Sequence, residues 1–402
     1  MNADRHPAGT EQTAGRRDEG RTIRAVSPPV RCTVIVLGYN GREYVEDCLS
    51  SVLDQDVPAD DVEVLYVDNG SRDGSLALVR ERFPQVRTLA LDHNYGYAEG
   101  NNLGFLEAQG EFVVFLNQDT VVHRSWLREL IAGVESSPDI VAAHANIIQP
   151  WYPEFAGIGQ RADVAAAYTA EVNRLGYMHY RRLPSADRPV DTIFLHGVCL
   201  IIRRALADEL DYVFDPDFFA YAEDLDLGLR VRALGYRSVV VPRAVVYHKH
   251  TLQTKPGWGT VVKTVRIIRN RYLAFFKVMS WSEFGMMVPL LTVGSPFNAR
   301  EFGLSRARRV LYGLALVPAT AAALAVTVGQ LPKYLEKRRQ VRRRAYQDRN
   351  WCLRALWGGV TTPDTEVARR PKVVAVEELE ALRAAQRRPA DGADAERRRL
   401  AG

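Results

Sequence analysis

Short, continuous apolar runs alternate in the first two thirds of the chain with stretches in which apolar residues recur every three or four positions. The continuous runs are rich in β-branched residues, as in strands buried on both faces, whereas the wider spacing is typical of amphipathic helices. We predict strands at 32–37, 62–67, 86–91, 112–116, 140–148, 193–202, 237–242 and 244–248, and helices at 43–53, 75–83, 99–108, 125–135 and 223–235. This alternation predicts an α/β domain with a mostly parallel sheet.

Composition shifts divide the chain into segments. Residues 1–30 are polar and end in two prolines, so we expect a disordered arm. The main domain is expected at 31–275, and its irregular stretch at 149–190 is interpreted as an insertion near the functional site. An apolar and basic helical segment follows at 276–344, and a partly helical tail is expected at 345–402.

Composition and charge exclude several classes of protein. Of the 402 residues, 47% are hydrophobic and 25% are charged, which rules out wholesale disorder, a collagen-like fibre and a polytopic membrane protein. The net charge of +5 owes much to the C-terminal third, so we expect no nucleic acid partner. The four cysteines form no C-x-x-C pair, and residues 1–24 lack the apolar stretch of a signal peptide, so we expect free thiols in the cytosol.

Small, polar or acidic residues follow each of the first four predicted strands. The loops read GYNG at 38–41, DNGS at 68–71, HNYGYAEGNN at 93–102 and NQDT at 117–120. Ligands of open parallel sheets bind at the carboxyl ends of the strands, so one crevice would collect all four loops. Ordinary turn chemistry is the alternative, but four such loops in succession favour a site.

Three common motifs are absent from these loops. The first strand is followed by neither G-x-G-x-x-G nor a Walker motif, which disfavours a dinucleotide dehydrogenase and a P-loop ATPase. The sequence also lacks the G-x-S-x-G elbow of α/β-hydrolases.

Six segments carry a resemblance to a known family. They read VIVLGYNGREYVEDCLSSVL, VDNGSRDGS, NYGYAEGNNLGF, FLNQDT, FLHGVCLIIRR and YAEDLDLGLRVRALGY. Together they resemble the family 2 inverting glycosyltransferases of GT-A fold, and most closely the bacterial rhamnosyltransferase-like branch, over about residues 31–275. The resemblance implies a Rossmann-like, mostly parallel GT-A domain, here with a C-terminal helical and partly apolar extension.

The resemblance implies a nucleotide-sugar site at the strand ends. Asp68 matches the aspartate that binds the pyrimidine of the donor, and an acceptor-only carboxylate suits the ring N3–H of uracil or thymine. The other implied donor-binding residues are Tyr39 beside the base, with Asn40, Gly70, Asn94, Gly96, Asn101 and Asp119 around the nucleotide and sugar.

A metal site is also implied, although its motif departs from the family pattern. Asp119 matches the last residue of the D-x-D motif, but this chain reads Asn117-Gln118-Asp119, so we expect weak metal affinity from the loop alone. His248 matches the histidine that completes the metal shell in many relatives, with His250 as a weaker alternative. The expected cofactor is Mg²⁺ or Mn²⁺.

The resemblance also implies a general base in the helix E-D-L-D-L-G-L-R. Asp224 matches the carboxylate that removes the proton of the acceptor hydroxyl, and Asp226 is the alternative. The two are about 200° apart around a helix, so both cannot face one sugar. Asp226 has the spacing of an i,i+4 ion pair with Arg230, and we expect Glu223 to orient the acceptor or the helix start.

Two uncharged stretches, 284–299 and 310–332, raise the question of membrane attachment. Basic residues lie between the two stretches, at Arg300, Arg306, Arg308 and Arg309, and after the second, at Lys333, Lys337, Arg338, Arg339, Arg342, Arg343 and Arg344. An in-plane hairpin keeps both basic clusters at the anionic cytoplasmic leaflet, so we expect monotopic or peripheral attachment. A single transmembrane helix at 310–332, and a core or dimerisation helix, are the alternatives.

These features predict an inverting glycosyltransferase on the cytoplasmic face of a bacterial inner membrane. We expect it to move one sugar, with L-rhamnose as the best guess, from a dTDP- or UDP-linked donor to a polyprenyl-diphosphate-linked or cell-wall glycan. A Q-x-x-R-W motif is absent, which disfavours processive synthesis. A non-catalytic nucleotide-sugar-binding subunit is the alternative of another class. A nucleotidyltransferase should have a Gly-rich, Lys-containing loop after the first strand, and this chain lacks that loop. The sequence does not decide whether the protein is a homo-oligomer.

Overall fold

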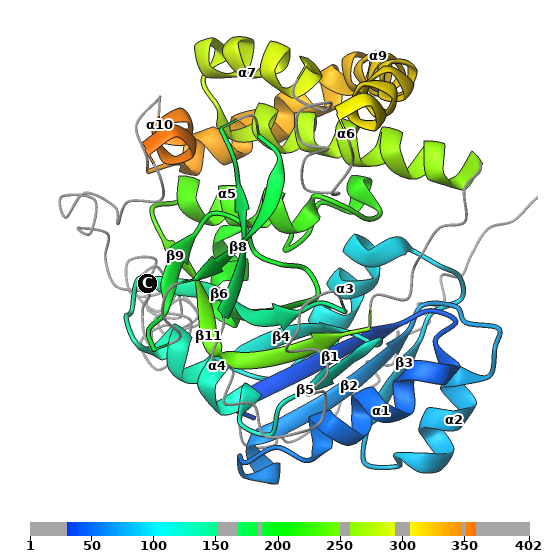
Figure 1. The fold of residues 1–402 in the computed structure, drawn as a ribbon. Coiled ribbons are helices and arrows are strands. Elements are labelled where there is room, and N and C mark those ends of the chain that lie inside the picture. The colour runs from blue at the N-terminus through cyan, green and yellow to red at the C-terminus, as the bar shows by residue number, and fades with distance from the viewer. Residues whose placement is uncertain are drawn as a thin grey trace, which may run out of the picture.

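A large twisted sheet with helices on both faces forms the lower part of the molecule, and a layer of helices lies above it (Figure 1). The computed structural model describes residues 30–150, 167–174, 176–183, 187–249, 258–293, 306–346 and 351–358. Of the predicted N-terminal arm at 1–30, residues 1–29 lie outside the described residues, as do the tail beyond 358 and His250.

The described residues form a nine-stranded sheet in the order β3-β2-β1-β4-β10-β6-β11-β5, with β9 also paired to β11. Its strands are β1 Cys32–Gly38, β2 Val62–Asp68, β3 Arg87–Ala90, β4 Phe112–Asn117, β5 Thr120–Val122, β6 Ile140–Ile148, β9 Val190–Thr192, β10 Cys199–Arg203 and β11 Arg237–His248. The first four strands along that order are parallel, as are β6 and β11. Because β10 runs antiparallel to both β4 and β6, it joins two parallel blocks into one sheet.

Helices cover both faces of the sheet because consecutive strand residues point to opposite sides. Val34 and Val36 of β1 face the core under α1 Arg42–Leu53, α2 Ser75–Arg82 and α4 Trp126–Glu135. Ile35 faces the other core, under α3 Gly96–Glu107 and α5 Glu223–Ala233. The predicted α/β architecture with a mostly parallel sheet is therefore confirmed.

The upper layer consists of α6 Trp258–Val278, α7 Trp281–Val293, α9 Arg306–Arg344 and α10 Trp351–Gly358 (Figure 1). The helix α5 belongs to both layers. Its Leu227 and Val231 pack into the sheet core, whereas Leu225 and Leu229 pack against the helical layer. The expected domain boundary between residues 275 and 276 falls inside α6, so the helical layer continues directly from the α/β domain.

Three predicted elements differ from the structure. The strand expected at 193–202 begins only at Cys199, because residues 193–196 are irregular and 197–198 form a turn. The two strands expected at 237–248 are one strand, β11, with an irregularity between Val241 and Val245. The irregular stretch at 149–190 includes a hairpin of β7 Ala167–Val172 and β8 Met178–Leu183.

Several basic residues that we expected at a membrane surface instead hold the helical layer together. Arg338 is buried and donates to the carbonyl of Phe276, and Arg342 donates to the carbonyl of Val278 at 2.8 Å. These contacts pack α9 on α6, so the lipid-facing role expected for Arg338 is wrong, whereas Arg342 is half-buried. Within the described residues no helix is both long enough and apolar enough to span a bilayer, so the alternative of a transmembrane helix at 310–332 is not supported.

Candidate active site

The loops that follow β1, β2 and β4 are joined by hydrogen bonds at one edge of the sheet. The amide of Asn69 donates to the carbonyl of Gly38 at 2.7 Å, and the amide of Asn40 donates to the hydroxyl of Ser71 at 3.0 Å. Gln118, after β4, donates to the carbonyl of Tyr39 at 3.0 Å. The parallel register brings these strand ends together, as the sequence predicted.

Asp68 ends β2 with a carboxylate that is only half satisfied. Its side chain is buried; one oxygen accepts from the amide of Ser71 at 3.2 Å, and the other has no hydrogen-bond partner among the described residues. An unpartnered buried carboxylate oxygen is costly unless a ligand donates to it. Gly70, two residues later, has a φ of 76°, and a Cβ there would come 2.6 Å from the backbone of His93.

The loop that precedes α3 closes against the end of β2. The side-chain oxygen of Asn94 accepts from the amide of Gly96 at 2.8 Å and from the side chain of Asn69 at 3.2 Å. Gly96 has a φ of 81°, a backbone conformation that glycine adopts without steric strain. The side chain of Asn101 donates to the carbonyl of Tyr97 at 3.0 Å. The structure therefore places the predicted donor-binding residues of this loop next to the Asp68 strand end.

Asp119 and His248 meet where β5 pairs with the end of β11. Both side chains are buried, and Asp119 Oδ1 lies 3.4 Å from His248 Nε2. The other ring nitrogen of His248 lies 3.3 Å from Gln149 Oε1. A carboxylate and an imidazole suit a divalent cation such as Mn²⁺, so this pair fits the metal that the resemblance implies. In the part of the chain that the structure describes, no group of three or more His, Cys, Asp and Glu side chains is arranged to hold a metal.

Asp224 lies in the first turn of α5. One of its carboxylate oxygens accepts from the amide of Gly197 at 3.1 Å and the other from the amide of Leu225 at 2.7 Å. Burial nevertheless raises the pKa of Asp224 to about 6. The pKa of the neighbouring Glu223 is also raised, by burial and by the charge of Asp224. Asp224 thus has a pKa suited to accepting a proton near neutral pH.

Asp226 has a different environment from Asp224. It is fully buried, its Oδ2 accepts from Arg230 at 2.8 Å, and its Oδ1 lies 2.6 Å from the ammonium of Lys277. The predicted i,i+4 pair with Arg230 is therefore confirmed. Two buried cations hold this carboxylate away from the side of the helix on which Asp224 contacts Gly197, which argues against the alternative assignment of Asp226 as the base.

The turn at 196–198 links the Asp224 end of the site to the other loops. Besides the bond from its amide to Asp224, Gly197 accepts from the hydroxyl of Tyr97 at 2.6 Å. The carbonyl of Val198 accepts from the amide of Asn117 at 3.0 Å. We did not predict the roles of Gly197, Tyr97 and Gln149 from sequence. The only signal was the His-Gly pair that interrupts the apolar run at 193–202.

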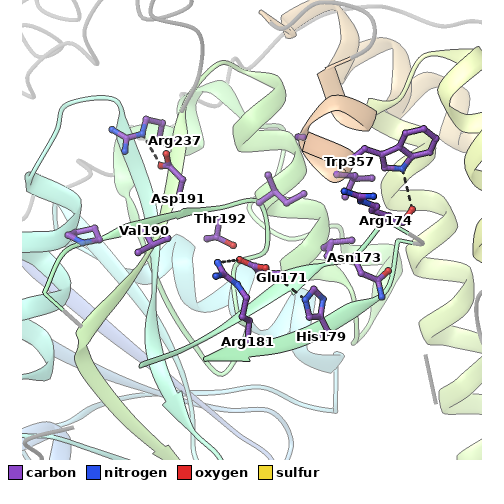
Figure 2. Close-up of a pocket in the computed structure, with 15 residues that line it drawn as sticks. Glu171, Asn173, Arg174, His179, Arg181, Val190, Asp191, Thr192, Arg237 and Trp357 are labelled. Carbon is purple, nitrogen blue, oxygen red and sulfur yellow. Dashed lines mark hydrogen bonds and ion pairs between the residues drawn. The ribbon is translucent and has the colours of Figure 1, made fainter. Parts of the chain in front are cut away.

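A separate cavity of about 880 Å³ lies between the β7–β8 hairpin, β9 and α10 (Figure 2). Its charged groups pair with one another, as Arg181 with Glu171 at 2.6 Å and Arg237 with Asp191 at 2.9 Å. None of the predicted site residues lines it. The candidate active site is therefore the strand-end edge and not this cavity.

Comparisons with known proteins find similarity to glycosyltransferases. The model of the family "Glycosyl transferase family 2" matches residues 33–211. The O-antigen biosynthesis protein RfbC of Myxococcus xanthus is 32% identical over 200 residues, which cover 46% of this chain and 15% of that protein. The N-acetylglucosaminyl-diphospho-decaprenol L-rhamnosyltransferase of Mycobacterium tuberculosis is 29% identical over 236 residues, or 54% of this chain and 75% of that enzyme.

A solved structure supports the fold. The crystal structure of GalNAc-T7 with UDP, GalNAc and Mn²⁺ has a TM-score of 0.50 at 15% identity, covering 64% of this chain and 49% of that one. At this identity the likeness concerns the fold alone. Residues 33–211 of the chain therefore match the glycosyl transferase family 2 model, and the α/β domain that contains them has the GT-A fold that the sequence predicted.

Proposed function

We propose that the chain is an inverting glycosyltransferase that uses Asp224 as its general base. The observation that carries the proposal is a half-buried carboxylate of raised pKa, tied through Gly197 and Tyr97 to the loop that holds the donor-binding asparagines. An inverting transfer needs one carboxylate that accepts the proton of the acceptor hydroxyl as that oxygen attacks the anomeric carbon. The leaving group is then the nucleoside diphosphate.

Asp68 and the loop around it supply the proposed donor site. The unpartnered oxygen of Asp68 would accept the N3–H of a uracil or thymine base. Tyr39, whose side chain is 44% exposed, is free to lie against that base. Asn94 and Gly96 form the backbone turn that would face the nucleotide and sugar.

Asp119 and His248 would hold a divalent cation, Mg²⁺ or Mn²⁺. When bound, the cation neutralises charge that develops on the departing diphosphate. Gln149 lies beside the second ring nitrogen of His248 and would fix the orientation of the ring. With two protein ligands, the site would bind the cation more firmly in the presence of the donor than without it.

For the substrates we propose dTDP-L-rhamnose as donor and a polyprenyl-diphosphate-linked or surface glycan as acceptor. The mycobacterial rhamnosyltransferase, at 29% identity, supports this class. Another dTDP- or UDP-sugar is the alternative donor. The acceptor would be reached at the cytoplasmic leaflet, where the exposed apolar face of α9 supports peripheral attachment: Val317, Val326 and Val328 are each more than 40% exposed.

A donor screen tests the proposal. Purified protein would be incubated with dTDP- and UDP-sugars and a polyprenyl-diphosphate-linked acceptor, with Mg²⁺, Mn²⁺ or EDTA, and release of nucleoside diphosphate would be measured. We expect release with one donor, and loss of release in EDTA or in Asp119→Ala. Tight binding of the nucleotide without release from any donor would instead support a non-catalytic binding subunit.

The role of Asp68 has a matched control. Asp68→Asn replaces an acceptor by a side chain that also donates, so we expect the KM for the donor to rise about tenfold or more. Asp60→Asn makes the same change at an exposed position before β2 and should leave the donor KM unchanged. Equal donor KM values in the two variants would contradict the assignment of Asp68.

A further inference from the structure

The loop that leads into α5 has an unusual backbone. Phe219, Tyr221 and Ala222 have φ values of 61°, 74° and 64°, in the region that side chains other than glycine rarely adopt. None of the three is a glycine, and Ala222 immediately precedes the first residue of α5. Such a backbone persists only where its surroundings hold it, and it is found preferentially at functional sites.

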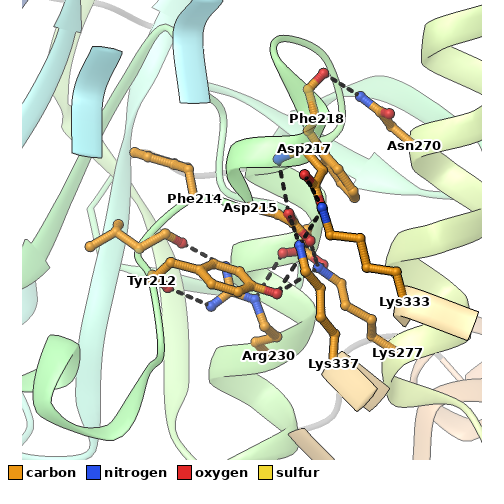
Figure 3. Close-up of polar contacts among 12 residues, drawn as sticks. Tyr212, Phe214, Asp215, Asp217, Phe218, Arg230, Asn270, Lys277, Lys333 and Lys337 are labelled. Atoms are coloured by element: carbon orange, nitrogen blue, oxygen red, sulfur yellow. Dashed lines mark hydrogen bonds and ion pairs between the residues drawn. The ribbon is translucent and has the colours of Figure 1, made fainter. Parts of the chain in front are cut away.

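One buried side chain on α6 holds this loop. Asn270 is fully buried, and its amide nitrogen donates to three carbonyls of the loop, those of Phe218 and Ala220 at 3.0 Å and that of Tyr221 at 2.7 Å (Figure 3 shows the bond to Phe218). Its side-chain oxygen accepts from Arg269 at 2.8 Å. The two amide hydrogens of Asn270 are therefore shared among three carbonyls of the loop.

The same loop contacts the proposed donor site on its other side. The carbonyl of Phe219 accepts from the amide of Ala98 in α3 at 3.0 Å. Gly96 packs so closely on Phe219 that a Cβ at this glycine would come within 2.6 Å of the phenylalanine ring. The loop thus lies between the donor-binding turn at 94–98 and the residue pair Glu223-Asp224.

A second contact from α6 fixes α5 from behind. Lys277 is seven residues after Asn270 and so lies on the same face of α6, two turns further on. Its ammonium is buried, 2.6 Å from Asp226 of α5 and 2.7 Å from Asp215 before the loop. Lys337 of α9 completes the cluster at 2.5 Å from Asp215 (Figure 3).

We infer that Asn270 is a positioning residue that holds the 218–222 loop so that Asp224 and the donor-binding turn keep a fixed relative position. The inference rests on the proposed function for its effect on turnover. The structural part of the inference, that Asn270 holds the loop, depends only on the contacts of Asn270 and Phe219. Asn270 is not among the proposed substrate or metal ligands, and its effect passes only through the loop.

The test compares Asn270→Ala with Asn146→Ala. Asn146 is likewise fully buried and donates to a backbone carbonyl, that of Pro242, but it lies in β6 away from the loop. We expect both variants to lose stability to a similar degree. Only Asn270→Ala should speed amide hydrogen exchange at residues 218–226 and at Ala98, and only it should lower kcat, by about tenfold or more, with the donor KM unchanged.

A second variant separates positioning from general damage. Ala222→Gly allows the positive φ without a Cβ, so in the Asn270→Ala background it should restore part of the lost kcat. Unchanged hydrogen exchange at 218–226 in Asn270→Ala would overturn the inference. So would faster exchange with wild-type kcat. A wild type that binds and turns over no donor would overturn the proposed function instead, while the exchange measurement would still decide whether Asn270 holds the loop.

Discussion

Two carboxylates of one short motif have opposite chemical environments. Asp224 accepts only from backbone amides and has a raised pKa, whereas Asp226 is fully buried between two cations. Both oxygens of Asp226 already contact buried cations, those of Arg230 and Lys277. Asp224 is therefore the residue for the proposed proton transfer, and Asp226 is the residue that anchors the helix α5.

The first prediction concerns Asp224→Asn. The amide keeps the shape of the side chain but cannot accept a proton, so we expect kcat to fall by about 10²-fold or more while the donor KM stays nearly unchanged. Steady-state kinetics with the donor found in the screen would measure this. Asp226→Asn is the comparison and should mainly lower stability. Near-normal turnover in Asp224→Asn with a loss in Asp226→Asn would reverse the assignment.

The second prediction concerns pH. Burial raises the pKa of Asp224 to about 6, and a general base works only when deprotonated, so kcat should decline as the pH falls through about 6. Because Glu223 titrates beside it, the apparent pKa belongs to the pair. A kcat profile that stays flat down to about pH 5 would contradict the prediction.

The free energy of unfolding should change with pH in the direction opposite to kcat: it should rise as the pH falls through about 6. Folded Asp224 binds its proton more tightly than the unfolded side chain, whose pKa is near 3.8. The contribution of this group is thus fully present below that pKa and is lost as the pH rises through about 6. Urea unfolding across this range, compared between wild type and Asp224→Asn, would measure the difference.

Polar residues at strand ends are a local property of the sequence, so Asp68 and Asp119 stand out where apolar runs stop. The roles expected for these residues and for Asn94 came from the resemblance to family 2 glycosyltransferases. Lys277 and Asn270 could not be found in this way, because each is one polar residue in a helical pattern whose partners lie about 50 residues away in the chain. Their role depends on which face of α6 meets α5, which the pattern alone does not specify.

At the element scale, α6 is the link between the proposed base and the C-terminal helices. Its Lys277 contacts α5, and the carbonyl of Phe276 accepts from Arg338 of α9. The strands and helices predicted from clear periodicity agree with those of the structure. The strand expected over 193–198 is wrong, because the apolar residues of this irregular segment are buried against α5 without forming a strand.

The third prediction concerns Lys277→Met. The change keeps the length of the side chain but leaves Asp215 and Asp226 with fewer buried cations, so the free energy of unfolding should fall by roughly 3–5 kcal/mol. Lys333→Met is the matched control, since its ion pair with Asp217 is exposed and should be worth about 0–1 kcal/mol. Chemical denaturation would measure both, and equal losses would mean that the cluster is not specifically stabilising.

At the scale of the whole molecule, α9 has two different sides. Its buried side carries Tyr334 and Arg338 into the helical layer. The residues of its exposed side between 317 and 332 are all uncharged and apolar, namely Val317, Pro318, Ala321, Ala322, Ala325, Val326, Val328, Gly329 and Pro332. Exposed basic residues, Arg339 and Arg343, follow at the C-terminal end. An apolar strip next to exposed cations is the arrangement expected of a helix that lies on an anionic bilayer.

The last prediction is that the protein binds vesicles of anionic lipid better than neutral ones, through this face of α9. Val326→Ser with Val328→Ser should weaken binding at any salt concentration, because apolar area is lost. Arg339→Gln with Arg343→Gln should weaken it mainly at low salt, by about 1 kcal/mol per charge.

Val261→Ser with Val262→Ser, exposed valines of α6, is the control and should bind as wild type does. Arg338 is left intact because it is buried, and its replacement would damage the fold. Vesicle co-sedimentation would measure all four proteins, and equal binding by wild type and the Val326/Val328 variant would place the attachment elsewhere.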